Sequence, residues 1–144
     1  MNNEVQKELK KIFNGRFSTS ESTRANYARG EDTYDPILSK AVVFPETNEE
    51  VSKILKLCNK HKVPVVPFGT GTSLEGNVVG NDKGITISLE KMNKILSVKA
   101  EDFDCRVQAC VTKEQLNEYL REDGVFFPID PGANAAIGGM ASTS

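Results

Sequence analysis

Cysteine is scarce in this sequence of 144 residues, and its spacing argues against two kinds of site. The three cysteines, Cys58, Cys105 and Cys110, are odd in number and lack the paired spacing of metal ligands. This usage favours a reducing compartment over a disulfide framework. Cys105 and Cys110 are five residues apart in an expected strand, which would place them on opposite faces. The cysteines are therefore predicted to be small core residues, and no metal site is predicted.

The sequence also lacks an excess of basic charge and any long apolar run. Its net charge is -2, with 18 Lys and Arg against 20 Asp and Glu interspersed along the chain. Such a balance argues against nucleic acid as a partner. No apolar run approaches the ~20 residues of a membrane span, and residues 1–16 have neither a signal-peptide core nor the acid-poor composition of a transit peptide. The expected location is cytoplasmic, with peripheral attachment to the inner membrane as the alternative.

A globular domain is indicated by the 38% hydrophobic and 26% charged residues. Residues 1–40 are expected to lead into it. They begin with an amphipathic helix whose apolar face is formed by Val5, Leu9, Ile12 and Phe13. The polar stretch from Phe17 to Lys40 then predicts a long irregular connection. We therefore divide the chain into a helix with an irregular lead-in over residues 1–40 and one domain over residues 41–144.

A strand, a helix and a second strand are predicted to follow one another from residue 41. The apolar run at 41–45 closes at a proline, and a capping box of Thr47 and Glu50 then begins a helix that reaches His61. The second apolar run, at 63–67, has the pattern of a strand buried on both faces. These elements together predict a parallel βαβ unit with a right-handed crossover.

The second half of the chain is predicted to be rich in strands. Residues 84–89 and 105–111 have strand patterns, with a turn at 92–95 between them. A second capping box at Thr112 opens a helix that ends at Gly124. The predicted fold class is therefore α+β, with a small parallel βαβ subdomain followed by a second, strand-rich α+β subdomain that we expect to be incomplete here.

A glycine-rich loop follows directly on the second buried strand, where a sheet usually presents its ligand loop. Gly69 and Gly71 have no side chains, so the backbone amides there can approach an anion closely. Thr70, Thr72 and Ser73 add hydroxyl donors. The loop is interpreted as a cradle for a pyrophosphate. The alternative is a tight turn that needs glycine only for its backbone angles.

Two common nucleotide-binding motifs are excluded by single residues in this loop. The segment Gly71–Gly76 has Walker A spacing, but Asn77 stands where a lysine must reach the phosphates. The segment Gly69–Gly71 begins a dinucleotide fingerprint, yet Leu74 occupies the position of its third glycine. Neither a P-loop NTPase nor a nicotinamide-binding Rossmann site is therefore expected.

A second segment dominated by small residues lies near the end of the sequence. Bare backbone at Gly132, Gly138 and Gly139 lets a flat ring system or a phosphate-bearing chain lie against it. Asn134 and Ser142 supply polar contacts. The alternative is a loop whose small residues serve only for packing.

Together, these segments resemble the FAD-binding domain of the vanillyl-alcohol oxidase or PCMH type, shared by FAD-linked D-lactate dehydrogenases, glycolate oxidases and 2-hydroxyglutarate dehydrogenases. The resemblance covers most of the chain and begins at about Ser22. The segments that carry it are 41–45, 64–76, 127–132 and Gly138–Gly139. Phe68 before Gly69, together with residues 74–76, is most similar to the cytochrome-linked D-lactate dehydrogenases.

The resemblance implies FAD as a non-covalent cofactor, because relatives with covalent flavin use a loop histidine and this loop has none. It assigns the pyrophosphate to the glycine loop and the rest of the flavin to the second segment. The cofactor-binding residues it implies are Pro67, Phe68, Gly69, Thr70, Gly71, Thr72, Ser73, Pro131, Gly132, Ala133, Asn134, Gly138, Gly139 and Ser142. Catalytic and metal-binding residues are expected beyond the last residue, so none is assigned.

The family chemistry implies oxidation of a D-2-hydroxy acid, D-lactate above all, to the 2-oxo acid by hydride transfer to flavin, with a cytochrome or quinone as electron acceptor. Two alternatives stay open: a stand-alone or remnant flavin- or nucleotide-binding module without turnover, and another reductase on the same flavin scaffold. The sequence stops inside a ligand segment, so we expect a truncated domain without turnover. We further expect self-association, for example as a homodimer, through exposed apolar edges.

Overall fold

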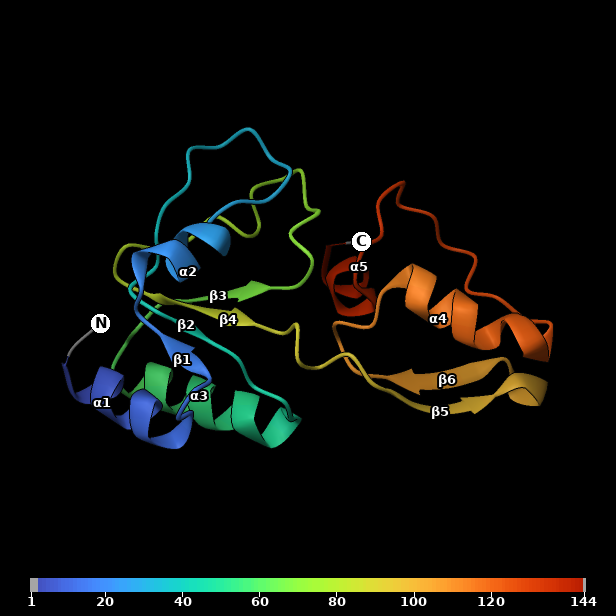
Figure 1. The fold of residues 1–144 in the computed structure, drawn as a ribbon, viewed down its shortest axis with the longest axis horizontal. Helices are drawn as coiled ribbons and strands as arrows, with labels where there is room; N and C mark the ends of the chain where they lie inside the picture. The colour runs from blue at the N-terminus through green and yellow to red at the C-terminus, as the bar shows by residue number, and fades with distance from the viewer. Residues whose placement is uncertain (1–2, 144) are drawn as a thin grey trace.

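The first lobe of the protein is built around a four-stranded sheet (Figure 1). The structure is a computed structural model that describes residues 3–143, so Ser144 of the predicted domain lies outside the described residues. The strands stand in the order β1-β2-β4-β3. β2, β4 and β3 are parallel, and β1 is antiparallel to β2. Their bounds are β1 (Phe17–Ser18), β2 (Val42–Val43), β3 (Val65–Phe68) and β4 (Ile85–Ser88).

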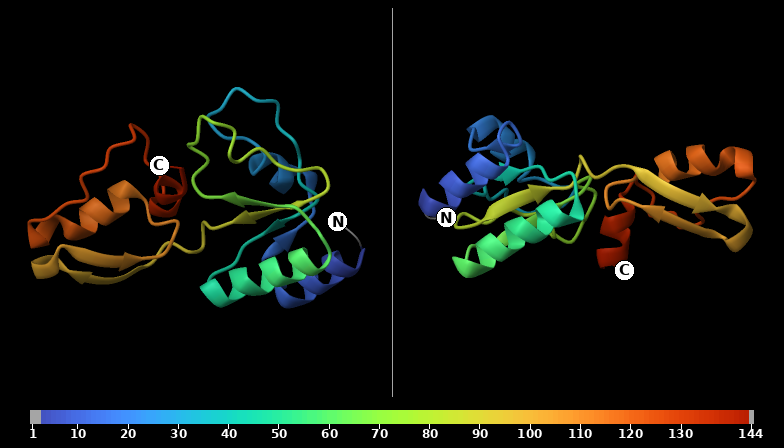
Figure 2. Two further views of the ribbon diagram at one scale, coloured as in Figure 1. Left: turned by 180° about the vertical axis from the view of Figure 1, so that it is seen from behind. Right: turned by 90° about the horizontal axis from the view of Figure 1, so that it is seen from below.

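Two helices, α1 (Asn3–Ile12) and α3 (Asn48–Lys60), cover one face of this sheet (Figure 2). The predicted apolar face of α1 is largely confirmed, because Val5, Leu9 and Phe13 are fully buried, but Ile12 on the flank is 44% exposed. α3 adds its own buried residues to the same core, which also takes in the strands: Ile54, Leu57, Cys58, Ala41, Val43, Val63, Ile85 and Ile87.

The start of α3 carries an ion pair with Arg16, which lies between α1 and β1. Thr47 caps the helix as predicted, with its side chain accepting a hydrogen bond from the Glu50 amide at 3.2 Å. The Glu50 carboxylate does not close the capping box. It accepts two hydrogen bonds from Arg16, at 2.6 and 2.7 Å, and one from the Glu46 amide at 2.7 Å. Arg16 also donates to the Phe44 carbonyl at 3.1 Å, so it joins the end of β2 to α3.

Two short elements interrupt the segment 17–40, which was predicted to be irregular throughout. β1 pairs with β2, and α2 (Glu21–Asn26) follows with Ser20 as its cap, accepting from the Thr23 amide at 3.3 Å. Both elements are too short to produce a periodic pattern in the sequence. The rest of the segment has no regular structure, and the predicted boundary at residue 40 stays a prediction.

The strand at 84–89 was predicted in the second subdomain, and this placement is wrong. It is β4, which lies at the centre of the first sheet between β2 and β3. All four residues of β4 are buried. Thr86 can be buried because its hydroxyl donates a hydrogen bond to the Ser39 hydroxyl at 2.9 Å. The βαβ unit is therefore present with a third parallel strand inserted between its two.

The second lobe is a hairpin covered by a helix (Figure 1). β5 (Ile95–Lys99) and β6 (Asp104–Val107) are antiparallel, and β5 begins where a turn was predicted. Short 3-10 turns, η1 (Ala100–Asp102) and η2 (Arg121–Asp123), follow β5 and α4 (Lys113–Leu120). The predicted start of α4 is confirmed, with Thr112 as its cap. The α-helix ends at Leu120, before the predicted end, and η2 continues the chain to Gly124, which is in the left-handed conformation. The lobe has its own core around Val111, Leu116 and Leu120, separate from that of the first lobe.

A last helix, α5 (Ile137–Thr143), replaces the loop that the glycine-rich ending suggested. Its first amides are held by the second lobe: Ile137 donates to the Val111 carbonyl and Gly138 to the Ala109 carbonyl, both at 2.8 Å. A Cβ at Gly138 would lie 2.8 Å from both the Cβ and the carbonyl oxygen of Ala109. Glycine therefore allows the helix to approach this segment. In Figure 1, α5 lies at the junction of the two lobes.

The cysteines are free thiols, and only two of them are core residues as predicted. Cys58 and Cys110 are buried, whereas Cys105 is exposed on β6. Cys110 lies beyond the end of β6, so the expected common strand does not extend to it. Burial raises the pKa of Cys58 to about 11. Within residues 3–143, none of the helices combines the length and the apolar character needed to cross a membrane.

Candidate functional site

A cavity of about 420 Å³ lies at the junction of the lobes, between the glycine loop after β3 and helix α5. The loop follows the C-terminal end of a parallel strand, the edge at which α/β sheets place their ligands. The opposite wall comes from the end of the chain, more than 60 residues later, and from Ala109 of the second lobe. Two segments that were singled out separately in the sequence are therefore brought together around one space.

Most of the predicted cofactor-binding residues line this cavity. They are Pro67, Gly69, Thr70, Gly71, Thr72, Ser73, Pro131, Gly138, Gly139 and Ser142. The other wall residues were not predicted: Asn77, Val78, Leu89, Ala109, Ala135, Ala136, Met140 and Thr143. Asn77 could have been found from its place directly after Gly76. Ala109 carries no sequence signal, because only the packing of α5 brings it to the cavity.

Four predicted residues lie away from the cavity wall. Phe68 is buried behind the loop, 7% exposed. The Asn134 side chain accepts a hydrogen bond from the Glu114 amide at 3.2 Å, which uses it at the start of α4. Gly132 has a φ of +81° in an exposed turn, and Ala133 follows it. The turn around Gly132 therefore contributes to the cavity through Pro131 alone.

The two loop glycines serve different purposes. Gly71 has a φ of +76°, and a Cβ there would lie 2.9 Å from Cζ of Phe68, so this position needs glycine for both its backbone and its packing. Gly69 has no such constraint. A Cβ at Gly69 would make only an ordinary contact with Ala136 at 3.5 Å. Gly69 lines the cavity, and the absence of a side chain leaves its backbone bare on the cavity wall.

The loop hydroxyls are arranged by short contacts within the loop. Thr70 and Thr72 share a hydrogen bond between their hydroxyls at 3.3 Å, and Asn77 donates to the Ser73 hydroxyl at 2.9 Å. Among the described residues, none of the side chains that line the cavity is charged. An anion there would be held by backbone amides and hydroxyl dipoles rather than by an ion pair. The described residues hold no group of three His, Cys, Asp or Glu side chains able to bind a metal ion.

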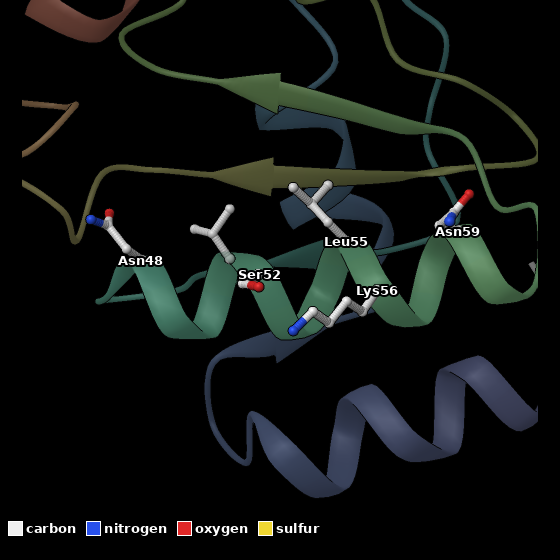
Figure 3. A pocket seen from close by; sticks show the side chains of 6 residues that line it. Asn48, Ser52, Leu55, Lys56 and Asn59 are labelled. Atoms are coloured by element: carbon white, nitrogen blue, oxygen red, sulfur yellow. The ribbon is translucent and has the colours of Figure 1, made fainter.

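A second depression, of about 570 Å³, runs along the outer face of α3. Figure 3 shows its labelled side chains, which all come from this one helix: Asn48, Ser52, Leu55, Lys56 and Asn59. They recur at the spacing of one solvent-facing helical stripe. No second element supplies polar groups that converge with them, so this face lacks the geometry of a binding site.

Comparison with known proteins identifies the family of the chain. Residues 39–144 match a protein family described as FAD binding domain. The chain belongs to this family. The matched range includes both walls of the cavity. FAD is accordingly the cofactor of this FAD-binding domain, and the residues present fit it: the walls combine bare backbone, small side chains and uncharged hydroxyl groups.

Curated relatives of this FAD-binding domain include D-lactate dehydrogenases. A probable mitochondrial D-lactate dehydrogenase of Danio rerio is 43% identical over 127 residues, covering 88% of this chain and 26% of the relative. A mitochondrial D-lactate dehydrogenase [cytochrome] of Arabidopsis thaliana is 39% identical over 142 residues, covering 97% of this chain and 25% of the relative. The chain thus spans about a quarter of the length of these relatives.

Solved structures share the fold. An alkyldihydroxyacetonephosphate synthase superimposes with a TM-score of 0.89 at 22% identity, covering 99% of this chain and 29% of that protein. The predicted fold class, a PCMH-type domain with a parallel subdomain followed by a second α+β subdomain, is confirmed. The main differences in topology from the sequence-based prediction are the place of β4 and the helix at the end.

Proposed function

We propose that this domain binds FAD non-covalently in the cavity between the lobes, as part of an oxidoreductase that converts a D-2-hydroxy acid, D-lactate above all, to the 2-oxo acid. The observation that carries the binding proposal is the convergence of the glycine loop and α5 on one uncharged cavity. The substrate proposal is supported by the relatives, whose names specify D-lactate dehydrogenase. When bound, FAD supplies the acceptor for the hydride.

The glycine loop is proposed to hold the FAD pyrophosphate. Amides at Gly69 and Gly71 can approach phosphate oxygens because no side chain shields them, and the hydroxyls of Thr70, Thr72 and Ser73 lie along the same wall. A neutral lining suits this role, since directed amide and hydroxyl dipoles can bind an anion without a lysine or arginine. The loop orients the cofactor and takes no part in proton transfer.

Helix α5 is proposed to line a further part of the FAD. Its Gly139 faces open space, with no atom within 4 Å of an added Cβ, so the backbone there is accessible to a flat ring. Ser142 donates its hydroxyl proton to the Gly138 carbonyl at 2.7 Å, and Thr143 donates to the Gly139 carbonyl at 3.0 Å. These hydroxyls therefore offer acceptor oxygens rather than donors to a ligand.

The electron acceptor and the cellular location rest on the relatives alone. One relative has cytochrome in its name, which supports a cytochrome as acceptor for the complete oxidoreductase, with a quinone as the alternative. Both relatives have mitochondrial in their names, so the cytoplasmic location expected from composition stays a prediction. The homodimer expected from exposed apolar edges also stays a prediction.

A titration with FAD, followed by flavin fluorescence and the visible spectrum, tests the binding site. We expect saturable binding by the chain. Gly139→Leu should abolish it by filling the cavity, and the variant should fold because nothing lies within 4 Å of the new Cβ. Ala141→Leu is the matched control, since Ala141 is exposed on α5 and does not line this cavity. Equal binding by both variants would contradict the proposed site.

Turnover separates the oxidoreductase from the alternative of a binding module without activity. We expect no D-lactate oxidation by the 144-residue chain with FAD, because it contains no residue assigned to catalysis. A screen of D-lactate, glycolate and D-2-hydroxyglutarate with a protein of the relatives' full length, carrying this sequence, tests the substrate class. Activity confined to a substrate of another class would favour the second alternative, a different reductase on the same scaffold.

A further inference from the structure

The segment 27–34 lies against the side of the glycine loop that faces away from the cavity. Figures 1 and 2 show the two irregular segments, 27–34 and 69–80, next to each other above the sheet. The segment precedes the range 39–144 matched by the family. None of its residues lines the cavity. Segment 27–34 nevertheless contacts the glycine loop at three places: the start, the middle and the far end of the loop.

The first contact is aromatic and lies where β3 passes into the loop. The Tyr27 ring packs edge-on against Phe68, with centroids 5.2 Å apart, and against Phe44, with centroids 5.3 Å apart. Its hydroxyl donates a hydrogen bond to the Glu90 carboxylate. Burial and this hydrogen bond raise the pKa of Tyr27 to about 12, so the hydroxyl remains a donor at neutral pH. Tyr27 thus holds Phe68, the residue directly before Gly69.

The second contact is made by backbone in the middle of the loop. The Glu31 amide donates a hydrogen bond to the Gly71 carbonyl at 3.0 Å. A Cβ at Gly30 would lie 2.9 Å from the same carbonyl oxygen and 2.6 Å from Cγ2 of Val78. The segment therefore lies so close to Gly71 and Val78 that no side chain fits at position 30.

The third contact lies at the far end of the loop. A Cβ at Gly76, which has a φ of +72°, would lie 2.7 Å from two ring carbons of Tyr34. The Tyr34 side chain nevertheless stays 61% exposed, so burial of its own surface gives it little reason to lie there. The Tyr34 ring instead covers Gly76, the glycine near the far end of the loop.

From these contacts we infer that residues 27–34 form a brace that selects the cofactor-binding conformation of the glycine loop, with Tyr27 and Tyr34 as positioning residues. This inference rests on the proposed function for its consequence in FAD binding, but the brace itself can be measured without FAD. The loop has positive φ angles at Gly71 and Gly76, and among the described residues its internal hydrogen bonds are mainly made by side chains rather than backbone. If only a fraction of the molecules has the loop in the conformation that binds FAD, the apparent Kd for FAD equals the intrinsic Kd divided by that fraction.

Tyr34→Ala tests the brace, with Tyr34→Phe as the conservative variant and Tyr119→Ala as the matched control. Tyr119 is 58% exposed, almost as much as Tyr34, and lies on α4 in the second lobe. Hydrogen exchange of the Glu31 amide, measured without FAD, reports the hydrogen bond to Gly71 directly. FAD titration and urea unfolding are measured on the same proteins.

We expect Tyr34→Ala to speed exchange of the Glu31 amide about tenfold and to raise the Kd for FAD about tenfold, as when the competent fraction falls to a tenth. Exchange in the β3 and β4 core should be unchanged. Tyr34→Phe should behave as the unmodified chain, and Tyr119→Ala should change neither quantity. Gly30→Ala, which displaces the segment from the Gly71 carbonyl, should have the same local effect as Tyr34→Ala, or a larger one.

Two outcomes would overturn the brace. One is unchanged Glu31 exchange in both Tyr34→Ala and Gly30→Ala. The other is a uniform rise in exchange through the core together with an equal loss of unfolding free energy, which would show an ordinary structural role. Failure of the unmodified chain to bind FAD would instead count against the proposed function, and the exchange of Glu31 would still decide the brace.

Discussion

The ion pair between Arg16 and Glu50 makes the stability of this domain dependent on acid pH. The hydrogen bonds from Arg16, at 2.6 and 2.7 Å, are the main cause that lowers the pKa of Glu50 to about 2. The side chains of Arg16 and Glu50 are only 24% and 22% exposed, so the pair is partly shielded from water. We predict that the isosteric variant Glu50→Gln is less stable at pH 7 and loses part of the acid sensitivity of the chain.

The size of this effect follows from proton linkage. Lowering a carboxyl pKa from 4.5 to about 2 corresponds to roughly 3 kcal/mol of stability at neutral pH. Because the pair is partly exposed and screened by salt, we expect about 1–2 kcal/mol. The folded-state pKa is depressed, so this stability is present above about pH 4.5 and is lost as the pH falls toward 2.

Urea unfolding followed by circular dichroism, at several pH values between 7 and 2.5, measures the effect. The difference in unfolding free energy between the unmodified chain and Glu50→Gln should be largest at pH 7 and should shrink steadily below about pH 4.5. Arg16→Gln should reproduce it, and combining the two changes should add little further loss. A difference that is the same at pH 7 and at pH 2.5 would refute the role assigned to the ion pair.

Three further predictions concern the second lobe and the thiols. Gly138→Ala should lower the thermal midpoint and weaken FAD binding, because its Cβ would lie 2.8 Å from the Ala109 carbonyl; an unchanged midpoint would contradict that packing. Thr112→Ala removes the cap of α4 and should reduce the unfolding free energy by about 1 kcal/mol in urea titrations. Cys105 is exposed and should react with a thiol reagent under native conditions, whereas Cys58, buried with a pKa of about 11, should react only after unfolding.

Local signals predicted much of the fold because they act within one turn of chain. The caps at Thr47 and Thr112 marked the starts of α3 and α4, and the apolar runs marked β2 and β3. The place of β4 could not be predicted from its own residues, since the hydroxyl of the buried Thr86 bonds to Ser39, which is distant in sequence. α5 was missed because paired glycines disfavour a helix, and its first amides bond to Ala109 and Val111 rather than to a local cap.

The candidate site was predictable where a single stretch of backbone forms it. The composition of the glycine loop and its place after a buried strand both indicate a ligand loop. Most of the loop residues that line the cavity could therefore be named from the sequence. The turn at Gly132 also has small residues, yet Asn134 is used to start α4, and the composition alone does not reveal this use. Ala109 enters the cavity through tertiary packing only, which no local pattern records.

The position of the cavity between two separate cores has a consequence for how the domain unfolds. Each lobe packs its own hydrophobic cluster, and polar contacts such as the hydrogen bond from the Gln108 side chain to the Glu46 carbonyl, at 3.0 Å, cross between them. A ligand held by both walls binds only when both lobes are folded, so its binding free energy couples their stabilities. Without FAD, the two lobes can unfold in separate transitions. With FAD bound to both walls, they should unfold together in one cooperative transition.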